Sequence, residues 1–533
     1  MGSFCAELRL WLAGKADRWR LALLVFTAVY ASLLLINLGN PPVQWDEMSH
    51  LNGGLLLNHG KTQEYFAGGY YPPLYDFVTT SYYQMFGVSV ASGRLTAVTF
   101  SILSIWIVYE FACQAFDPKI ALLSSILLGT MPAFFWLSGV AMLETILVFF
   151  FSLSLFFFFM WIRTNKNKAI VLSGLALGVG ALAKYQALVA IPVMIASILL
   201  LERDKVKRRF SKFFVVPAIM ILVLLPWLIV LYQNNGVNDF NQLLYAASEG
   251  HEDRALYSVR FPAPIFYFIE LAWSFSYVPI YPISLPVYIL GLAGLGLFAW
   301  RRKTEDKFLL TWFIVVYVFF TMIPNKQWRY VISLFPVLAI SAASFVFFAY
   351  AKLAKVQKEG QFSLSKRRML KVASLLIVGI AVASVAYSSY NVYQGISNEQ
   401  IHIPIEEATN YAVEKMQPNE SIMVLTPFNF FNRDMVEFYI QTTEPRMNKV
   451  LQYPVLPVDA FKPDFNVTTL ISQCKEQKVK YVFLYEYGAE VPYFQSNMTA
   501  MTVYQELDDS GRFVVEHRVG SFPRTITIFA FVP

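Results

Sequence analysis

The sequence predicts a polytopic α-helical membrane protein of about eleven spans, followed by a soluble α/β domain on the outer face of the membrane. The first observation is composition. The chain of 533 residues is 56% hydrophobic and 15% charged, with a mean hydropathy of +0.48, whereas soluble domains carry about 25% charged residues. The second observation is a change of character, because long apolar runs fill residues 1–390 whereas residues 391–533 are polar.

Apolar runs of about 18 to 22 residues are typical of membrane spans, and shorter runs are tolerated where neighbouring helices cover their ends. No small-residue cleavage pattern follows the first run, so we expect it to stay as an anchor. The aromatic stretch 262–278 contains Glu270 and fits an interfacial helix or part of another hairpin. The predicted spans lie near residues 21–38, 95–115, 119–132, 141–162, 169–183, 186–201, 213–232, 281–300, 308–323, 330–350 and 372–389.

Basic residues orient these spans. With the N-terminus inside, the inner segments include the clusters at 203–212, 301–307 and 352–371, and the outer loops carry far fewer cations. This bias is the positive-inside pattern, so it predicts a cytoplasmic N-terminus and an outer C-terminal domain. Because the positive charge follows the topology and forms no basic face, the net charge of +7 does not indicate nucleic-acid binding.

The tail alternates helical and strand patterns, which predict a small α/β domain with a largely parallel sheet. We expect helices at 404–416, 435–440 and 470–475, and strands at 422–425, 480–485, 512–516 and 525–531. Three Asn-X-Ser/Thr sites, at Asn419, Asn466 and Asn497, suit an outside location. Cys474 is the tail's one cysteine, so an internal disulfide is excluded there.

An acidic pair, Asp46 and Glu47, follows the first span in the segment Val-Gln-Trp-Asp-Glu-Met-Ser-His. A carboxylate held there by a rigid element can face a reaction at the lipid boundary. The alternative is that the pair only caps the next helix, since acids favour helix N-termini. A third acid, Glu144, lies at the outer start of the fourth span. It either takes part in the same reaction or stabilises the helix by interacting with its dipole.

Basic residues at the outer ends of helices require an explanation, because the positive-inside rule disfavours them on that side of the membrane. Arg329 starts the tenth span, Lys184 lies in a short turn between spans five and six, and Arg94 precedes span two. An anionic partner at the membrane surface explains all three. The alternative is that each reaches the interface and binds lipid headgroups.

The ordered motifs resemble those of polyprenyl-phosphate-sugar-dependent membrane glycosyltransferases of the GT-C class. The nearest resemblance is to the branch of protein O-mannosyltransferases and lipid A aminoarabinose transferases. After the acidic pair come Tyr-Pro-Pro-Leu-Tyr at 71–75, Ser-Gly-Arg-Leu at 92–95, Met-Leu-Glu at 142–144, Leu-Ala-Lys at 182–184 and Arg329-Tyr330. The series covers roughly the first 350 residues, and its order and spacing are its specific features.

The resemblance implies a role for each matching position. Asp46 matches the family's first-loop catalytic acid, with Glu47 as its neighbour, and Glu144 stands where the family has a second acid, usually Asp. The implied donor-binding residues are Arg329, Lys184, Arg94, Tyr330 and Tyr71. Relatives of the lipid A type carry Lys before the Pro-Pro pair where this chain has Tyr70-Tyr71, which argues against lipid A as the acceptor.

The predicted function is therefore transfer of a sugar from a polyprenyl- or dolichyl-phosphate donor to a hydroxyl or amine on the outer side, with inversion. Asp46 would be the general base, and Arg329 and Lys184 would hold the phosphate. The acceptor could be a protein, a glycolipid or a cell-surface polysaccharide. No cofactor is required by the pattern. A divalent metal is an open alternative, with Asp46, Glu47 and His50 as candidate ligands.

Two other classes compete with the enzyme. A transporter or lipid-linked sugar flippase would use the acids as an ion site, although such proteins place ionisable groups at mid-membrane and show repeated halves. A scaffold would act through its outer domain. The outward loop 233–260 either covers the active site or is a solvated polar loop. The tail and its three glycosylation sites favour an archaeal cell membrane, with the endoplasmic reticulum as the alternative.

Overall fold

The computed structural model describes the chain in two compact units, and each of the helices α5 (Leu74–Phe86) and α6 (Val90–Ala115) contributes residues to both. The first unit is Met1–Leu38, Lys61–Val78 and Arg94–Ser397, and the second is Gly39–Gly60, Thr79–Gly93 and Asn398–Pro533. Cys5, Asn419, Asn497 and most of the 233–260 loop lie outside the described residues. The described residues are 18–39, 41, 43–67, 71–201, 206–238, 241–242, 244–245, 258–273, 281–359, 364–398, 403–417, 420–426, 431–442, 455–459, 465–487, 499–521 and 524–533.

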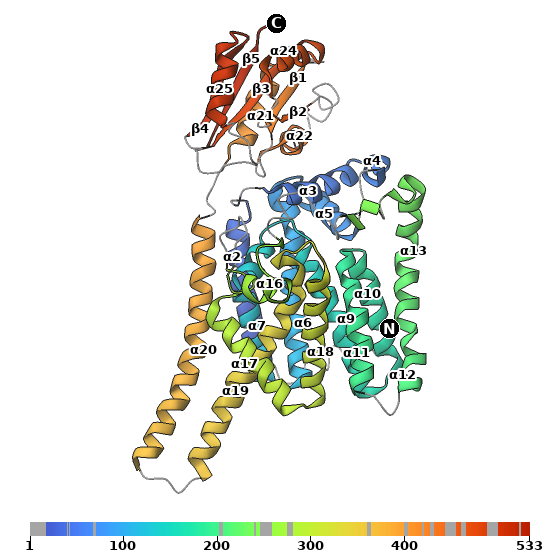
Figure 1. Cartoon of the computed structure of the whole chain (residues 1–533), viewed down its shortest axis with the longest axis vertical. Helices are drawn as coiled ribbons and strands as arrows, with labels where there is room; N and C mark the ends of the chain where they lie inside the picture. Colours follow the sequence, from blue (N-terminus) through green and yellow to red (C-terminus); the bar gives the residue numbers. More distant parts are fainter. Residues whose placement is uncertain are drawn as a thin grey trace. The chain divides into compact units, whose positions relative to one another are not determined.

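Each predicted span corresponds to a helix of the first unit (Figure 1). Within the described ranges, six helices are long and apolar enough to cross a membrane, or seven if the bent pair α7–α8 is one span. The count of eleven therefore stays a prediction. The helices are α2 (Arg18–Asn37), α6 (Val90–Ala115), α7 (Pro118–Thr130), α8 (Pro132–Ser138), α9 (Glu144–Thr164), α10 (Asn167–Ala181), α11 (Ala190–Leu201), α13 (Val215–Asn235), α17 (Leu285–Arg301), α18 (Thr304–Met322), α19 (Phe335–Glu359) and α20 (Leu364–Asn398).

Short elements join these helices. They are α4 (Thr62–Ala67), α12 (Val206–Phe213), α16 (Ala263–Glu270) and two 3-10 helices, η1 (Tyr185–Val189) and η3 (Trp328–Leu334). The last long helix, α20, continues past residue 390, where the sequence analysis ended the membrane domain. Its final turns are polar enough to look soluble yet keep helical geometry.

Burial separates central helices from peripheral ones. Only 22% of the apolar window of α2, α13 and α20 is buried, whereas the value is 67% for α6 and α9 and 83% for the η3–α19 segment. Aromatic side chains fill the centre: Phe111 of α6 stacks on Phe159 of α9 at 5.3 Å, and Phe151 lies 5.6 Å from Trp312 of α18. This packing fixes α9, and Glu144 is its first residue.

Helices α17 and α19 approach each other through small residues. A Cβ added at Gly294 would lie 2.0 Å from the backbone oxygen of Ser341, and the Ser341 hydroxyl donates to the Gly291 carbonyl at 2.8 Å. Glycines at such positions let two membrane helices pack with their backbones in contact. The pair therefore needs glycine at 294 for its geometry.

We expect Gly294→Ala to destabilise the protein, because the added methyl forces two packed backbones apart, at a cost of about 1–3 kcal/mol. Gly296→Ala is the matched control on the same helix, since nothing lies within 4 Å of its added Cβ. The measurement is the thermal midpoint of the purified protein in detergent. Equal midpoints for the two variants would show that the close approach of α17 and α19 does not limit stability.

The second unit contains a five-stranded sheet of order β2-β1-β3-β5-β4. Strand β1 pairs in parallel with β2 and β3, whereas β5 pairs antiparallel with β3 and β4. The sheet is thus mixed, and the prediction of a largely parallel sheet is wrong. Only two residues join β4 to β5, and so short a connection permits only an antiparallel pair. The strands are β1 (Ser421–Thr426), β2 (Val455–Asp459), β3 (Val479–Tyr487), β4 (Phe513–Ser521) and β5 (Arg524–Phe531).

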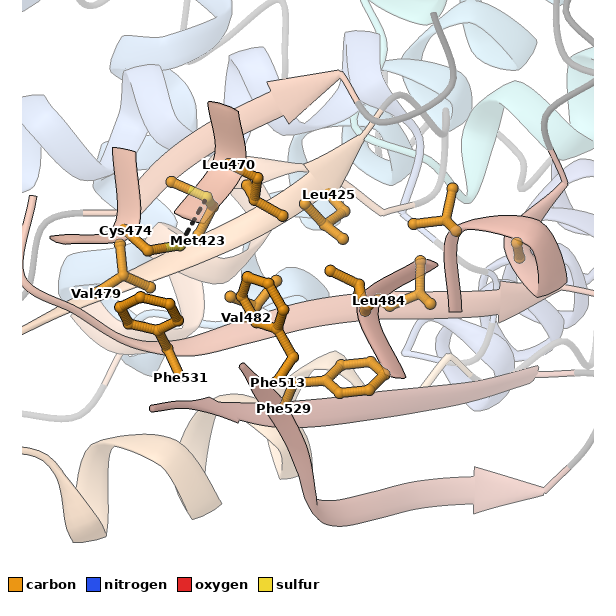
Figure 2. Close-up of a cluster of buried hydrophobic side chains, with 13 residues drawn as sticks. Met423, Leu425, Leu470, Cys474, Val479, Val482, Leu484, Phe513, Phe529 and Phe531 are labelled. Carbon is orange, nitrogen blue, oxygen red and sulfur yellow. Dashed lines mark hydrogen bonds between the residues drawn. The ribbon is translucent and has the colours of Figure 1, made fainter. Parts of the chain in front are cut away.

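Helices cover both faces of this sheet. Helix α21 (Ile405–Lys415) contacts β4 and β5 and also α22 (Arg433–Gln441), which contacts β2. Helices α24 (Val467–Glu476) and α25 (Ala500–Asp509) contact β3. Alternate residues of each strand supply the two layers. One layer, shown in Figure 2, consists of Met423, Leu425, Leu470, Cys474, Val479, Val482, Leu484, Ala500, Val503, Leu507, Phe513, Phe529 and Phe531.

Cys474 is fully buried in this layer, 3.9 Å from the sulfur of Met423. Burial raises the pKa of its thiol from 9.0 to about 12. The raised value means that the neutral thiol stabilises the folded domain fully below pH 9, and that this contribution is lost as the pH rises from about 9 to about 12.

We therefore expect Cys474 to resist maleimide at pH 8 in the folded protein and to react in denaturant, because the thiolate is the nucleophile. Mass spectrometry of the labelled peptides separates Cys474 from the other cysteines. Labelling of native Cys474 at the rate of an exposed thiol would contradict its burial. Denatured protein at the same pH is the control.

Three helices begin between the first two predicted spans: α3 (Trp45–Asn58), α4 and α5 (Leu74–Phe86). The sequence analysis did not predict them, nor β2 and α25. Strand β2 contains Pro457, which lacks an N–H, and it lies at the edge of the sheet, where proline is tolerated. Its five residues carry too little pattern to be recognised as a strand.

Candidate active site

Helix α3 presents the predicted acidic pair in its first turn. The backbone N–H of Gln44 donates to the Glu47 carboxylate at 3.3 Å, so Glu47 satisfies a donor that would otherwise be unpaired at the helix start. Glu47 is fully buried, His50 is 5% exposed and Asp46 is half-buried. Of the two acids, Asp46 is thus the more accessible.

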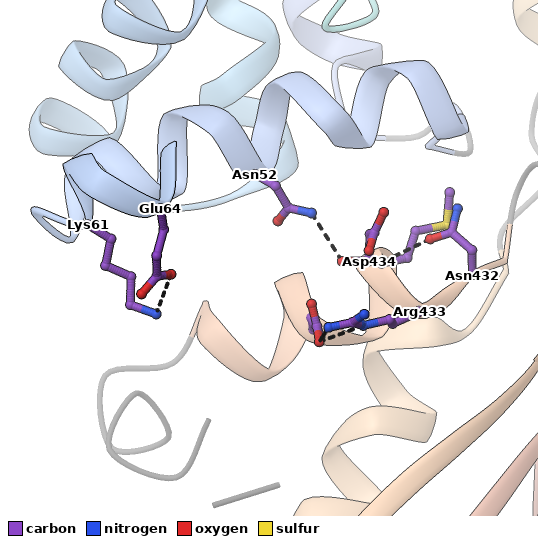
Figure 3. A network of polar contacts seen from close by, with 8 residues as sticks. Asn52, Lys61, Glu64, Asn432, Arg433 and Asp434 are labelled. Carbon is purple, nitrogen blue, oxygen red and sulfur yellow. Dashed lines mark hydrogen bonds and ion pairs between the residues drawn. The ribbon is translucent and has the colours of Figure 1, made fainter. Parts of the chain in front are cut away.

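Neighbouring elements of the second unit hold α3 in place. Tyr83 of α5 donates to the Leu51 carbonyl at 3.2 Å, and a Cβ added at Gly93 would lie 2.2 Å from the Leu51 side chain. Gly93 belongs to the Ser-Gly-Arg motif, so that motif serves close packing. Asn52 donates to the Asp434 carbonyl of α22 at 3.4 Å (Figure 3). These contacts fix the direction of the helix that carries Asp46.

In the first unit, Glu144 and Lys184 form an ion pair. The Lys184 Nζ donates to the Glu144 carboxylate at 2.7 Å, and the two side chains are 18% and 1% exposed. A buried carboxylate requires such a partner. The pair connects the start of α9 to the turn before η1, two positions that the sequence analysis selected independently.

The Tyr-Pro-Pro segment lies against the same turn. The backbone N–H of Leu74 donates to the Leu182 carbonyl at 3.0 Å, which places the segment that begins with exposed Tyr71 beside the turn that carries Lys184. Tyr185, the residue after Lys184, accepts a bond from the Trp227 indole of α13 at 2.9 Å. The Lys184 turn is therefore anchored on both sides.

Arg329 and Tyr330 lie in η3, and α9 contacts both η1 and η3. The Arg329 Nε donates to the Gln327 side-chain oxygen at 2.6 Å, and the Asn325 amide donates to the Tyr330 hydroxyl at 3.4 Å. Helix α9 thus contacts both the 3-10 helix that follows Lys184 and the 3-10 helix that contains Arg329. The sequence analysis selected both cations but did not identify Gln327 as a partner.

Arg94 has a different environment. Its side chain is 0% exposed, and one guanidinium nitrogen donates to the Leu38 carbonyl at 2.8 Å, directly after the end of α2. A cation at a helix C-terminus satisfies the last carbonyls and the helix dipole. This position favours a structural role, and a contact of Arg94 with phosphate stays a prediction.

The sequence analysis missed another buried acid, Asp76, near the start of α5. It is 5% exposed and accepts a 2.9 Å bond from the Tyr65 hydroxyl of α4. Burial, followed by the charge of Asp76, raises the pKa of Tyr65 well above its usual range, so that this hydroxyl stays a donor. A signal was available, because an acid two residues after Pro-Pro-Leu at the membrane boundary requires a partner.

Asp46, Glu47 and His50 were the candidate metal ligands. Among the described residues, no group of three or more His, Cys, Asp or Glu side chains is arranged to hold a metal ion. The capping bond of Glu47 is consistent with this finding, since it directs that carboxylate to the helix start.

A family model and a curated relative each match part of this chain. A family model described as dolichyl-phosphate-mannose-protein mannosyltransferase matches residues 71–230. An undecaprenyl phosphate-alpha-4-amino-4-deoxy-L-arabinose arabinosyl transferase from Pseudomonas fluorescens is 26% identical over 266 residues. The matched stretch is 48% of this chain and 45% of that relative, so the chain matches about half the length of the curated protein.

Solved structures match over nearly the whole chain. ArnT from Cupriavidus metallidurans in the apo state covers 95% of this chain and 97% of its own, with 15% identity and a TM-score of 0.63. A second structure of that protein, bound to undecaprenyl phosphate, gives 17% identity and a TM-score of 0.59 over 96% of this chain and 98% of its own. The archaeal oligosaccharyltransferase AglB from Archaeoglobus fulgidus, in complex with an inhibitory peptide and a dolichol-phosphate, covers 88% of this chain and 69% of its own, with 14% identity and a TM-score of 0.56.

The fold is that of ArnT and AglB, so the predicted GT-C-like helical membrane fold is confirmed. The number of spans and the outer position of the C-terminal domain stay predictions. The resemblance to polyprenyl-phosphate-sugar-dependent transferases, drawn from the order of the motifs, is confirmed as well. Together with its apolar helices, these matches identify the chain as an integral membrane protein.

Proposed function

We propose that the protein transfers a sugar from a polyprenyl-phosphate-linked donor to an acceptor hydroxyl or amine on the outer side of the membrane. The observation that carries this proposal is the linkage within the first unit: α9 begins with Glu144, Glu144 pairs with Lys184, and α9 also contacts the element that carries Arg329. Two cations so held at helix ends suit a lipid phosphate.

The relatives support the donor class. The family model and the Pseudomonas relative are named for dolichyl-phosphate and undecaprenyl-phosphate donors. The two proteins of like fold were solved with undecaprenyl phosphate and with a dolichol-phosphate. A transporter would need ionisable groups at mid-membrane, whereas the candidates here lie at helix ends.

In the proposed reaction, an acceptor oxygen or nitrogen attacks the sugar's anomeric carbon as the bond from that carbon to the phosphate oxygen breaks. Asp46 accepts the proton of the acceptor, and polyprenyl phosphate leaves with the electron pair of the broken bond. Attack from the face opposite the phosphate inverts the anomeric configuration. Arg329 and Lys184 stabilise the negative charge that grows on the leaving phosphate.

The remaining candidates act on these groups. Glu47 fixes the first turn of α3, and so the position of Asp46, through its bond with the Gln44 N–H. Glu144 holds Lys184 in place, and the ion pair exchanges partners when phosphate enters. Tyr330 follows Arg329 in η3, and Tyr71 belongs to the segment whose Leu74 N–H donates to the Leu182 carbonyl. Both tyrosines are proposed to contact the donor.

We also propose an archaeal cell membrane as the location, with a cytoplasmic N-terminus and with the active site and residues 391–533 outside. The basic clusters between spans and the exposed sequon at Asn466 support this orientation. The acceptor is a protein, a glycolipid or a cell-surface polymer.

The test uses purified full-length protein in lipid vesicles with radiolabelled dolichyl- and undecaprenyl-phosphate sugars. The proposal predicts that label leaves the lipid-phosphate fraction, by transfer to added acceptor or by slow hydrolysis. Label that crosses a sealed vesicle while still attached to its lipid would instead support a flippase. No binding and no consumption of any donor would contradict the proposal.

A further inference from the structure

We propose that Trp227 is a positioning residue for the donor phosphate: its indole N–H, together with the Tyr185 hydroxyl that accepts it, holds the turn that carries Lys184. This inference rests on the proposed function, because it assigns the phosphate of a polyprenyl-phosphate lipid as a ligand of Lys184. Trp227 belongs to none of the ordered motifs and lies within the long apolar helix α13.

Lys184 is an extended residue between two helical elements. Helix α10 ends at Ala181 and η1 begins at Tyr185, whereas Lys184 itself has φ −156° and ψ 126°. One side of this break is fixed, because the Lys184 N–H donates to the Gly180 carbonyl at 2.9 Å and a Cβ added at Gly180 would lie 2.8 Å from the Phe150 Cβ of α9. The direction of the Lys184 side chain depends as well on what holds η1 on the other side.

Trp227 holds η1 directly. Its indole Nε1 donates to the Tyr185 hydroxyl at 2.9 Å. Trp227 is 5% exposed, although only 22% of the apolar window of α13 is buried. A buried indole N–H is a donor only and requires an acceptor, so the bond fixes how the two rings lie. Because Tyr185 follows Lys184 directly, this bond fixes the start of η1 and limits the freedom of the turn.

Close packing of α13 on α10 brings Trp227 to this place. A Cβ added at Gly178 of α10 would lie 2.7 Å from the Val223 Cβ of α13, so the two helices approach each other through that glycine. Val223 and Trp227 lie one helical turn apart on the same face of α13. The face that packs on α10 is therefore the face that presents the indole to the segment after α10.

Trp227 is also connected to the turn by a second route. Its ring centroid lies 6.2 Å from that of Phe66 in α4, and Tyr65 of the same helix donates to Asp76 of α5 at 2.9 Å. The start of α5 is bonded to the turn through the Leu74 N–H. Phenylalanine in place of the indole can keep the ring contact with α4, so it removes the direct route alone.

The chemistry of the bond suits a phosphate site. In the structure the Lys184 Nζ donates to the Glu144 carboxylate at 2.7 Å, and in the proposed reaction it also contacts the phosphate. A lysine side chain is flexible, so a firmly held backbone reduces the freedom that remains to be lost when the phosphate binds. The indole and the phenol are neutral, so they orient the turn without adding a charge that competes with the phosphate.

The test measures KM and kcat for consumption of radiolabelled dolichyl- and undecaprenyl-phosphate sugars by the full-length protein in lipid. Trp227→Phe and Tyr185→Phe each remove one partner of the bond and keep an aromatic ring. Each should raise the KM for the donor about two- to tenfold, the range of one neutral hydrogen bond, and the double variant should raise it no further. Trp300→Phe, at a 69% exposed indole of α17, is the matched control and should keep the wild-type KM.

The split between KM and kcat separates positioning from a merely structural effect. A smaller folded fraction lowers kcat and leaves KM unchanged, and that result would overturn the inference. Wild-type KM values in both single variants, or additive increases in the double variant, would overturn it while the proposed function stands. Wild-type protein that consumes neither donor would overturn the inference together with the proposed function.

A second cycle tests whether the effect passes through Lys184. The background is Lys184→Met with Glu144→Gln, which removes both charges and leaves no buried carboxylate without its partner. The measurement is equilibrium binding of radiolabelled dolichyl phosphate and undecaprenyl phosphate, which needs no turnover. Trp227→Phe should weaken binding in the otherwise wild-type protein and cause no further loss in this background. An equal loss in both would show that Trp227 does not act through Lys184 and would overturn the inference.

Discussion

We expect Asp46→Asn to lower the rate of sugar transfer by about 10²- to 10⁴-fold and to leave donor binding nearly unchanged, because Asp46 is the proposed base. The asparagine side chain has the same shape but cannot accept the acceptor's proton at neutral pH. Asp46 is half-buried in the first turn of α3. The Leu51 carbonyl of this helix accepts a bond from Tyr83, and Asn52 donates one to the Asp434 carbonyl, so the substitution leaves the helix in place. The loss therefore falls on kcat rather than KM.

Glu47→Gln is the matched control for this prediction. Glu47 is fully buried and accepts the Gln44 N–H, and glutamine can keep that bond. We expect this variant to lose at most about 1 kcal/mol of stability, the usual value of a helix cap, and to keep most of its activity. If Glu47→Gln loses transfer and Asp46→Asn retains it, the two acids exchange roles.

We expect Arg329→Ala to lower kcat/KM for the donor by about 10²- to 10³-fold, because it removes one of the two cations proposed to stabilise the leaving phosphate. Lysine at this position should recover only part of the loss, since it is a point charge without the planar fork whose Nε donates to Gln327. The measurement is steady-state transfer over a range of donor concentrations. Increasing salt should weaken donor binding to the wild-type protein less than it weakens an exposed ion pair.

Lys326→Met is the control for the loss of a neighbouring positive charge. Its ammonium donates to two backbone carbonyls of its own segment, so its removal should disturb local structure more than donor binding. A Lys326→Met variant as inactive as Arg329→Ala would show that general positive charge, and not an oriented guanidinium, binds the donor.

Much of the fold follows from local pattern. The apolar runs located each long helix of the first unit, and the run at 480–485 located the central strand β3, because hydrophobic periodicity reports burial directly. Helices α3 and α5 escaped prediction because their buried positions are filled by glycine, histidine and tyrosine as well as leucine. The antiparallel half of the sheet was not predicted. The two-residue connection between β4 and β5 requires antiparallel pairing only once the two strands are known to be neighbours.

Like the fold, the candidate site could be predicted only in part from the sequence. Topology singled out Glu144, Lys184 and Arg329, because charges at outer helix ends are costly without a partner. The pairing of Lys184 with Glu144 depends on the tertiary structure, since 40 residues separate them in the sequence. Gln327 could not be selected, because a glutamine near an arginine is common and only the fold shows their contact. Asp76 was missed although its place at the membrane boundary called for a partner, and only the fold identifies that partner as Tyr65.

The most direct test of the proposed roles measures donor binding and single-turnover transfer on the same samples of wild type, Asp46→Asn and Arg329→Ala. The expected result is a separation: Asp46→Asn binds the polyprenyl-phosphate sugar like wild type and does not transfer it, whereas Arg329→Ala loses binding. Full turnover by a well-folded Asp46→Asn variant, or wild-type affinity in Arg329→Ala, would contradict the assignment of base and phosphate-binding residue.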